Sequence, residues 1–125
     1  MIKGLHHIAI ICSDKQRSLS FYVDALGFEI VRTHVRPEHH DEIIMLEGYG
    51  VVLELFIDDT HPPRVTNPEA LGLRHLAFRV EDVEKLSESL KARGFYPELI
   101  RKDSFTCEKM TFVKDPDGLP IELHE

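Results

Sequence analysis

GLHHIAI, at residues 4–10, decides how this sequence is read, because nearly the same string returns as GLRHLAF at residues 72–78. His7 in the first string and His75 in the second are 68 residues apart. Self-similarity at a fixed separation is the sequence mark of repeated structural units. The two strings therefore predict a chain built from two copies of one unit.

The same separation links two glutamates. Glu122 follows Glu54 by 68 residues, and apolar residues flank both, in LEL and in IEL. A strand glutamate between apolar neighbours costs free energy if it is buried without a partner, and a divalent cation would offset that cost. Two imidazoles and two carboxylates that converge across a pseudo-twofold axis form a metal site. We therefore predict a metalloprotein that arose by internal duplication.

Length, composition and charge limit the classes of protein. The chain has 125 residues, of which 42% are hydrophobic and 30% charged, with a net charge of -7. This length suits one soluble domain, and the acidic balance argues against a nucleic-acid binder. The apolar runs are too short for a membrane span, and the N-terminal one predicts a strand rather than a signal peptide. Cys12 and Cys107 lack CxxC spacing, so we expect reduced thiols in a cytoplasmic protein.

The first copy has the pattern of a β-α-β-β-β unit. Its helix is indicated by an apolar stripe with helical spacing, made of Leu19, Tyr22, Val23 and Leu26. The expected elements are a strand at 5–11, a helix capped by Ser13 or Asp14 and ended by Gly27, and strands at 28–35, 42–46 and 51–57.

The second copy repeats this order. The expected elements are a strand at 73–80, a helix that begins at Asp82 and ends at Gly94, and strands at 96–101, 109–113 and 119–124. The side chains expected to point inward from the helix are Val83, Leu86 and Leu90. The string DPDG at 115–118 predicts a turn before the last strand. We thus expect a single domain, with module one at 1–57, a proline-rich connector at 58–71 and module two at 72–125.

Strand parity places the four candidate ligands on one side of each sheet. Side chains alternate between the two faces of a strand, so the apolar neighbours of each glutamate share the face opposite to it. Those neighbours are expected to pack on the helix. His7 and Glu54 then share the other face of module one, and His75 and Glu122 share the other face of module two.

With these elements the chain resembles the vicinal oxygen chelate superfamily, and within it the small bacterial glyoxalase I-like proteins. The matching strings are HHIAIICSD, SLSFYVDALGF, VVLELF, GLRHLAFRVEDV and DPDGLPIEL, which span nearly the whole chain. The resemblance implies an α+β fold in which two βαβββ modules form a cup-shaped half-barrel, the glyoxalase/bleomycin resistance/extradiol dioxygenase fold. It also implies a homodimer.

Carried over position by position, the resemblance makes His7, Glu54, His75 and Glu122 the metal ligands. Nickel, cobalt or zinc is the expected ion, with manganese or iron as alternatives. A histidine-glutamate-histidine-glutamate set is similar to that of glyoxalase I. The extradiol dioxygenases and fosfomycin-modifying thiol transferases of the superfamily use two histidines and one glutamate instead.

The implied reaction is that of a lactoylglutathione lyase. A hemithioacetal of a 2-oxoaldehyde such as methylglyoxal becomes a 2-hydroxyacyl thioester by proton transfer through an enediolate that the metal stabilises. Glu122 is the first candidate for the base and Glu54 the second. Bacterial glyoxalase I carries an arginine at the position of Ile11, whereas Arg79 holds the equivalent place in module two and is our candidate for substrate binding. The identity of the thiol stays open.

Alternatives from the same superfamily also stay open. They are thiol transfer, epimerisation or dioxygenation at the same metal, and non-enzymatic binding of a drug or other ligand. Retention of all four ligands counts against the last. His6 and His124 flank the ligand strands and are candidates for hydrogen-bond partners of the ligands. The segment 102–109 is either a lid or a plain loop.

Overall fold

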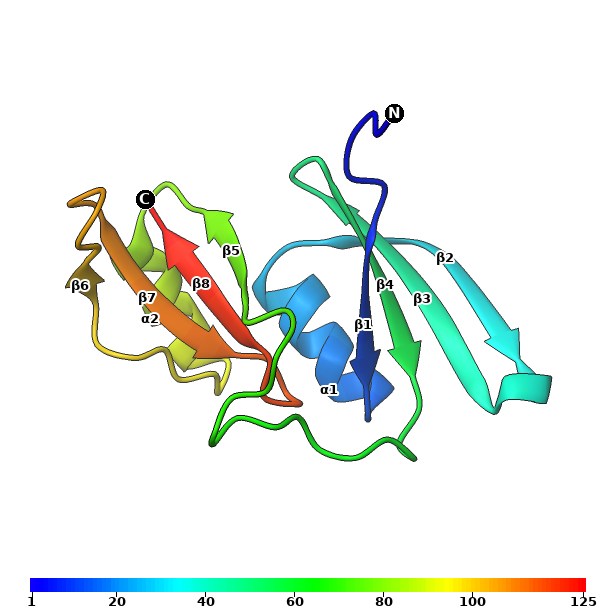
Figure 1. Cartoon of the computed structure of the whole chain (residues 1–125). Helices are drawn as coiled ribbons and strands as arrows, with labels where there is room; N and C mark the ends of the chain where they lie inside the picture. The colour runs from blue at the N-terminus through cyan, green and yellow to red at the C-terminus, as the bar shows by residue number, and fades with distance from the viewer. The chain divides into compact units, whose positions relative to one another are not determined.

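The computed structural model describes residues 1–125 and divides them into two compact units, Met1–Pro62 and Pro63–Glu125. The division falls inside the predicted connector. Each unit contains one four-stranded sheet, and the two sheets carry the repeated β-α-β-β-β order. Figure 1 shows the helices and strands of each unit. No helix in either unit is long and apolar enough to cross a membrane.

The first unit has a sheet in the order β1-β4-β3-β2. Strand β1 runs parallel to β4, while the β3 pairings with β4 and β2 are antiparallel. Its elements are β1 (Ile8–Cys12), α1 (Lys15–Leu19), the π-helical turn η1 (Ser20–Ala25), β2 (Glu29–Arg36), the 3-10 turn η2 (Pro37–His39), β3 (Asp41–Gly48) and β4 (Val51–Ile57). The four predicted strands are thus present, although β1 starts later than expected, so that His7 lies one residue before it.

The helix of the first unit differs from the prediction in its second half. It begins where expected, because the Asp14 carboxylate accepts a hydrogen bond from the Arg17 N–H. After α1 the backbone widens into η1, a π-helical turn that shifts the buried face of the helix. Phe21 and Tyr22 are fully buried, whereas the predicted stripe residue Leu19 is only half-buried. A regular 3.6-residue period was therefore the wrong template here.

The core of the first unit lies between this helix and one face of the sheet. The side chains of Leu53 and Leu55 in β4 are completely buried, as strand parity predicted. Cys12 is buried on the same side and is not in a disulfide. The other face carries the candidate ligand Glu54, and the sheet thus separates core from candidate site.

The second unit has a sheet in the order β5-β8-β7-β6, with β5 parallel to β8. The equivalent strands of the first unit are paired in the same way. Its elements are β5 (Leu76–Arg79), α2 (Val83–Ala92), β6 (Arg101–Lys102), β7 (Lys109–Lys114) and β8 (Pro120–His124). Ile121 and Leu123 are buried on the helix side, again as predicted. The predicted turn is held by the Asp115 carboxylate, which accepts the N–H groups of Asp117 and Leu119.

Helix α2 follows the prediction closely. Asp82 caps it by accepting the Lys85 N–H, and Val83 and Leu90 are fully buried. Gly94 follows with a φ of 88°, a left-handed conformation that suits glycine at the end of a helix.

The predicted strand at 96–101 is wrong for most of its length. Only Arg101 and Lys102 pair with β7, as the short strand β6. Pro97 explains the difference, because it has no N–H to donate to a sheet ladder. The segment instead runs beside β7 through separate bonds, in which the Glu98 N–H donates to the Phe112 carbonyl and the Thr111 hydroxyl donates to the Glu98 carbonyl.

Candidate metal centre

In the first unit, His7 and Glu54 lie side by side. The His7 Nε2 atom is 3.5 Å from a Glu54 carboxylate oxygen. Glu54 sits in the middle of β4 in register with Ala9 of β1, and His7 lies two residues before Ala9 on the same face. The Glu54 side chain is 19% exposed, so its carboxylate is accessible to a ligand although the residues that flank it are buried.

The second unit reproduces this arrangement. The His75 Nε2 atom is 3.3 Å from a Glu122 carboxylate oxygen, and the Glu122 side chain is 13% exposed. Glu122 is in register with Ala77 as Glu54 is with Ala9, so the pair occupies the same place in the second sheet. The structure therefore brings the four predicted ligands together two by two, one histidine and one glutamate in each unit.

Neighbouring side chains orient the two histidines. In the first unit, the Nδ1 atoms of His6 and His7 are 2.8 Å apart, so this contact holds the ring edge of His7 opposite to Nε2. In the second unit, Phe112 meets the ring of His75 edge-on at 5.0 Å between centroids. Each histidine thus presents Nε2 to its glutamate, with the rest of the ring supported by the protein.

The donor atoms of each pair suit a shared divalent metal. Nitrogen and oxygen ligands bind such ions at about 2.0–2.2 Å, and two adjacent ligands of one ion are then about 3.0–3.5 Å apart. The separations of 3.5 Å and 3.3 Å fall in this range. Imidazole with carboxylate suits zinc, nickel, cobalt, iron and manganese. Each pair thus fits half of a mixed nitrogen and oxygen centre.

One row of residues along each sheet lies next to the ligand row on the same face. In the second unit, strand register aligns four residues across the sheet: Arg79, His124, Met110 and Arg101. In the first unit, the equivalent residues are Ile11, Phe56, Ile43 and His34. We call these four-residue sets the adjacent rows. The row of the second unit carries two arginines, and that of the first unit is mostly apolar.

A second polar group adjoins Glu122 in the second unit. Asp103, Glu122 and His124 place one ligand atom each within 4.8 Å of the others. His124 Nδ1 is 2.6 Å from the Glu125 carbonyl, and its Nε2 is 3.0 Å from the Thr106 hydroxyl oxygen. Since a carbonyl only accepts, Nδ1 carries a proton. The ring nitrogens of His124 thus contact Glu125 and Thr106 rather than a ligand histidine, so the predicted role as a hydrogen-bond partner of the ligands stays a prediction.

Asp103 organises the segment 102–109. Its carboxylate accepts the N–H groups of Phe105 and Thr106, and these bonds hold the pKa of Asp103 below its ordinary value. The Cys107 N–H donates to the Asp103 carbonyl. The segment is therefore a hydrogen-bonded loop. Sequence analysis missed Asp103, although an aspartate that begins a polar loop is a common signal for such a turn.

An arginine stacks on a phenylalanine in each unit. Arg36 in β2 lies over the Phe56 ring at 5.4 Å, and Arg101 in β6 lies over the Phe112 ring at 5.6 Å. These distances are typical of a cation–π contact. Neither contact was predicted, because each depends on how side chains of different strands pack on one face of the sheet.

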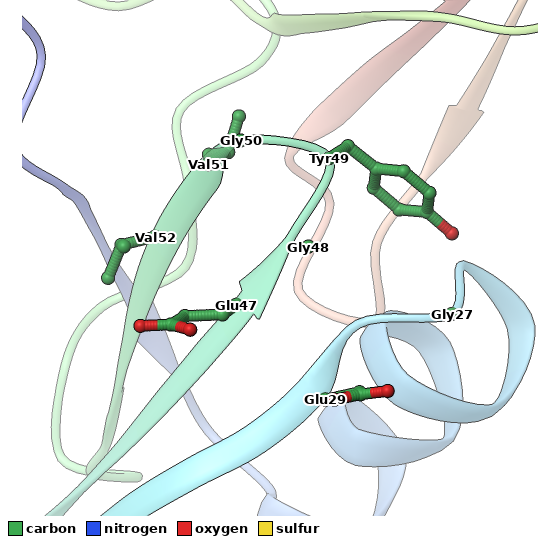
Figure 2. Close-up of a pocket in the computed structure, with 8 residues that line it drawn as sticks. All are labelled: Gly27, Glu29, Glu47, Gly48, Tyr49, Gly50, Val51 and Val52. Atoms are coloured by element: carbon green, nitrogen blue, oxygen red, sulfur yellow. The ribbon is translucent and has the colours of Figure 1, made fainter.

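A hollow of the first unit lies at the turn between β3 and β4. Its volume is about 620 Å³, and it is lined by Gly27, Glu29, Glu47, Gly48, Tyr49, Gly50, Val51 and Val52. In Figure 2, Glu47 and Val52 point to one side, while Tyr49 reaches toward Gly27. The Tyr49 hydroxyl donates to the Leu26 carbonyl at 2.6 Å. The hollow contains no histidine or cysteine, and it meets the ligand face through Val52, two residues before Glu54, and through Glu47, which pairs with Val52.

The remaining histidines form no metal cluster. His61 lies 3.4 Å from the Asp58 carboxylate, and the pKa of Asp58 lies below its ordinary value mainly because Thr60 donates hydrogen bonds to it. The group of Asp103, Glu122 and His124 is the sole set of three candidate ligand residues that converge.

Comparisons with known proteins identify the family. The model of the Glyoxalase/Bleomycin resistance protein/Dioxygenase superfamily matches residues 4–123. The chain therefore belongs to this superfamily, as the sequence motifs predicted. The structure of a glyoxalase family protein from Enterococcus faecalis is 50% identical, with a TM-score of 0.93 over 98% of both chains. This likeness confirms the predicted fold class.

Two relatives show the range of similarity within the family. The uncharacterized protein YwkD of Bacillus subtilis (strain 168) is 45% identical over 100% of this chain and 98% of its own length. The lactoylglutathione lyase of Escherichia coli O157:H7 is 30% identical over 97% of this chain and 91% of its own length. The chain is thus similar over its whole length to an enzyme of the glyoxalase I type, at lower identity than to YwkD.

Proposed function

We propose that the protein is a metal-dependent enzyme of the glyoxalase I type. In this proposal it converts the hemithioacetal of a 2-oxoaldehyde, such as methylglyoxal, to a 2-hydroxyacyl thioester, which is the reaction class of lactoylglutathione lyase. The observation that carries the proposal is the duplicated histidine-glutamate pair, placed at the same register in both sheets. The similarity to a lactoylglutathione lyase supports it.

The proposed metal ligands are His7, Glu54, His75 and Glu122. Each unit supplies two of the four, so a complete centre needs one pair of His7 with Glu54 and one pair of His75 with Glu122. The two pairs belong either to one chain or to two chains of a homodimer that exchange units. Nickel, cobalt or zinc is the proposed ion. We further propose that the protein is cytoplasmic and acts on a small molecule in the form of a thiol adduct.

The chain's own residues would carry the proton. Glu122 removes the proton from the carbon next to the substrate carbonyl and returns it to the neighbouring carbon, with Glu54 as the second candidate for this role. When bound, the metal would supply Lewis-acid stabilisation of the negative charge that develops on the substrate oxygens. The flanking leucines and isoleucine keep the face opposite to each glutamate closed to water.

Arg79 is the proposed substrate-binding residue. It lies on the same face as Glu122, in register with His124, and its guanidinium forms no ion pair in the structure. An exposed arginine without a carboxylate partner keeps its donors available for an anionic substrate.

Metal analysis tests the first half of the proposal. Protein purified without added metal is titrated with nickel, and bound nickel is measured by mass spectrometry for the wild type and for His7→Ala and His75→Ala. We expect one tightly bound ion per site in the wild type and a large loss of affinity in both variants. If either variant binds nickel like the wild type, that histidine is not a ligand.

An activity assay tests the second half. The nickel-loaded protein is given methylglyoxal with a panel of thiols, among them glutathione, and thioester formation is followed by absorbance. Turnover sustained by nickel or zinc alone would exclude dioxygenation, which needs a redox-active metal. Nickel binding without turnover for any thiol would favour another reaction of the superfamily or a binding protein.

A further inference from the structure

Arg101 is a cation on the ligand face of the second unit that no step above uses. Strand register places it in the adjacent row, since it pairs with Met110, which in turn pairs with His124. Its guanidinium lies over the Phe112 ring, and Phe112 pairs with Glu122. The side chain thus leans from the adjacent row toward the row of the ligand glutamate.

The distance from Arg101 to the candidate metal ligands is short. The guanidinium carbon is 5.6 Å from the centre of the Phe112 ring, and that ring is 5.0 Å from the centre of the His75 ring. The guanidinium is therefore within about 11 Å of the His75 ring, and closer if the contacts bend. The guanidinium is thus within reach of the far end of a small ligand whose oxygens lie beside His75 and Glu122.

The charge of Arg101 is largely available to a ligand. Its one carboxylate contact is with Glu98 at 3.1 Å through Nη1, and the two side chains are 53% and 57% exposed. Ion pairs this exposed to water contribute little and are easily exchanged. The contact with Phe112 limits the positions that the guanidinium can take, and its Nε and Nη2 groups, which form no ion pair, are available as donors to an oxyanion.

Arg36 provides the contrasting case in the first unit. It stacks on Phe56 in the same manner, but both Nε and Nη2 donate to the Asp41 carboxylate. This bidentate contact raises the pKa of Arg36 and lowers the pKa of Asp41. The Arg36 side chain is 25% exposed, about half the value for Arg101. Because its Nε and Nη2 groups already donate to Asp41, Arg36 has few donors left for an anion.

We propose that Arg101, held on Phe112, binds an oxyanion group of the substrate, either carboxylate or phosphonate. The substrate is then an acid whose charged end lies a few bonds from the two oxygens at the metal. This inference rests on the proposed function, because it assumes that the substrate reaches the histidine-glutamate pair. Glu98, Asp103 and Glu122 are the acidic groups nearby, and the last two have other partners in the loop and in the proposed centre.

A matched set of ligands tests the proposal on nickel-loaded full-length protein. Butyrohydroxamate and succinate monohydroxamate both chelate metals through two adjacent oxygens, and only the second ends in a carboxylate. Isothermal calorimetry gives the affinity of each, and phosphonoacetohydroxamate distinguishes a phosphonate from a carboxylate preference. We expect the wild type to bind an acidic ligand about tenfold more tightly than the neutral one, as for one charge-assisted bidentate contact.

Substitutions of Arg101 and Arg36 test which arginine causes the preference for the acidic ligand. In Arg101→Gln the ratio of the two affinities should fall severalfold, to the part that Arg79 supports, while butyrohydroxamate binds as in the wild type. Arg101→Lys should restore part of the preference, because lysine keeps the charge but not the fork. Arg36→Gln removes the other arginine that stacks on a phenylalanine, and this control variant should keep the wild-type ratio. An unchanged preference in Arg101→Gln would overturn the proposal.

A metal-free measurement separates this inference from the proposed function. Inorganic phosphate is titrated into metal-free protein, and the Nε–Hε resonance of Arg101 is followed by NMR. We expect a saturable shift in the wild type and in Arg36→Gln. If phosphate leaves this resonance unmoved, the anion site is refuted, whatever metal the protein binds. If the shift is present but nickel does not bind, the proposed function fails and the anion site stands.

Discussion

The two units share a ligand row and differ in the row beside it. Ala9 with Glu54 in the first unit corresponds to Ala77 with Glu122 in the second, at the same register. One row further along the strands, Ile11 and Phe56 of the first unit are replaced by Arg79 and His124 of the second. The two units thus have the same residue types in the ligand row and different residue types in the adjacent row.

The difference indicates separate tasks for the two rows. In the proposed centre the metal takes one histidine-glutamate pair of each kind, which would account for the matching glutamates. A substrate without internal symmetry would place unlike groups against the two sheets, so nothing requires the adjacent rows to match. The apolar row is suited to a hydrocarbon or methyl group and the arginine-bearing row to a charged one. The predictions below test how far the two units are equivalent.

The largest expected effect separates the two ligand glutamates. We expect Glu122→Gln to lower kcat by about a thousandfold, as for loss of a general base, and Glu54→Gln to lower it less when both are fully loaded with nickel. Steady-state kinetics with parallel metal analysis make the comparison. The assignment of the base to Glu122 would be reversed if Glu54→Gln were the more damaging change.

The two cores are expected to respond alike. Leu55 and Leu123 hold equivalent positions, with exposed fractions of 0% and 1%. Truncation of either to alanine removes buried apolar surface and leaves a cavity, so each should lower the free energy of unfolding by about 3 kcal/mol. Urea denaturation measures both. A much smaller loss at one position would mean that the two units do not contribute equally to stability.

The glycines that end the two helices should differ in their tolerance of a side chain. Gly27 and Gly94 both have positive φ values, 86° and 88°. A Cβ at Gly27 would lie 2.5 Å from the Tyr49 hydroxyl oxygen, whereas a Cβ at Gly94 has nothing within 4 Å. Gly94→Ala should cost about 1–2 kcal/mol from backbone strain alone.

Gly27→Ala should cost about 1 kcal/mol more, because the methyl group displaces the hydroxyl of Tyr49 from the Leu26 carbonyl. Thermal unfolding of the two variants is the measurement. Tyr49→Phe serves as the control, since it removes the hydroxyl and should narrow the gap between them. Equal costs in the Tyr49 background and in the Tyr49→Phe background would argue against the steric explanation.

The smallest expected effect concerns the ion pair between Arg36 and Asp41 in the first unit. The bond from Arg36 lowers the pKa of Asp41 below its ordinary value of 3.8. The ionised carboxylate therefore stabilises the fold above about pH 4, and this contribution disappears as the pH falls through the lower folded pKa. Asp41→Asn should be slightly less stable than the wild type at neutral pH.

The difference between Asp41→Asn and the wild type should shrink as the pH falls below about 4. Chemical denaturation across this range gives the comparison, and Asp24→Asn, for which no ion pair is present, is the control. A difference that stays constant with pH would show that the contact does not act through the charge of Asp41.

The elements predicted most accurately are those with short-range signals. Strand β4 matches its predicted bounds, and Asp14 and Asp82 cap their helices as expected. The predictions for η1 and for the strand at 96–101 were wrong. In the first case packing of Phe21 and Tyr22 overrode a regular helical period. In the second, Pro97 has no N–H to donate, and only Arg101 and Lys102 pair with β7.

By itself, the sequence determined the duplication, the family and the two histidine-glutamate pairs. It could do so because a fixed separation and the two-residue period of a strand are properties of the chain alone. Only the tertiary structure decided which residues share a row with Glu122, that Arg101 lies on Phe112, and that Asp41 occupies the fork of Arg36. These depend on the register between paired strands and on side-chain packing, which local sequence patterns do not encode.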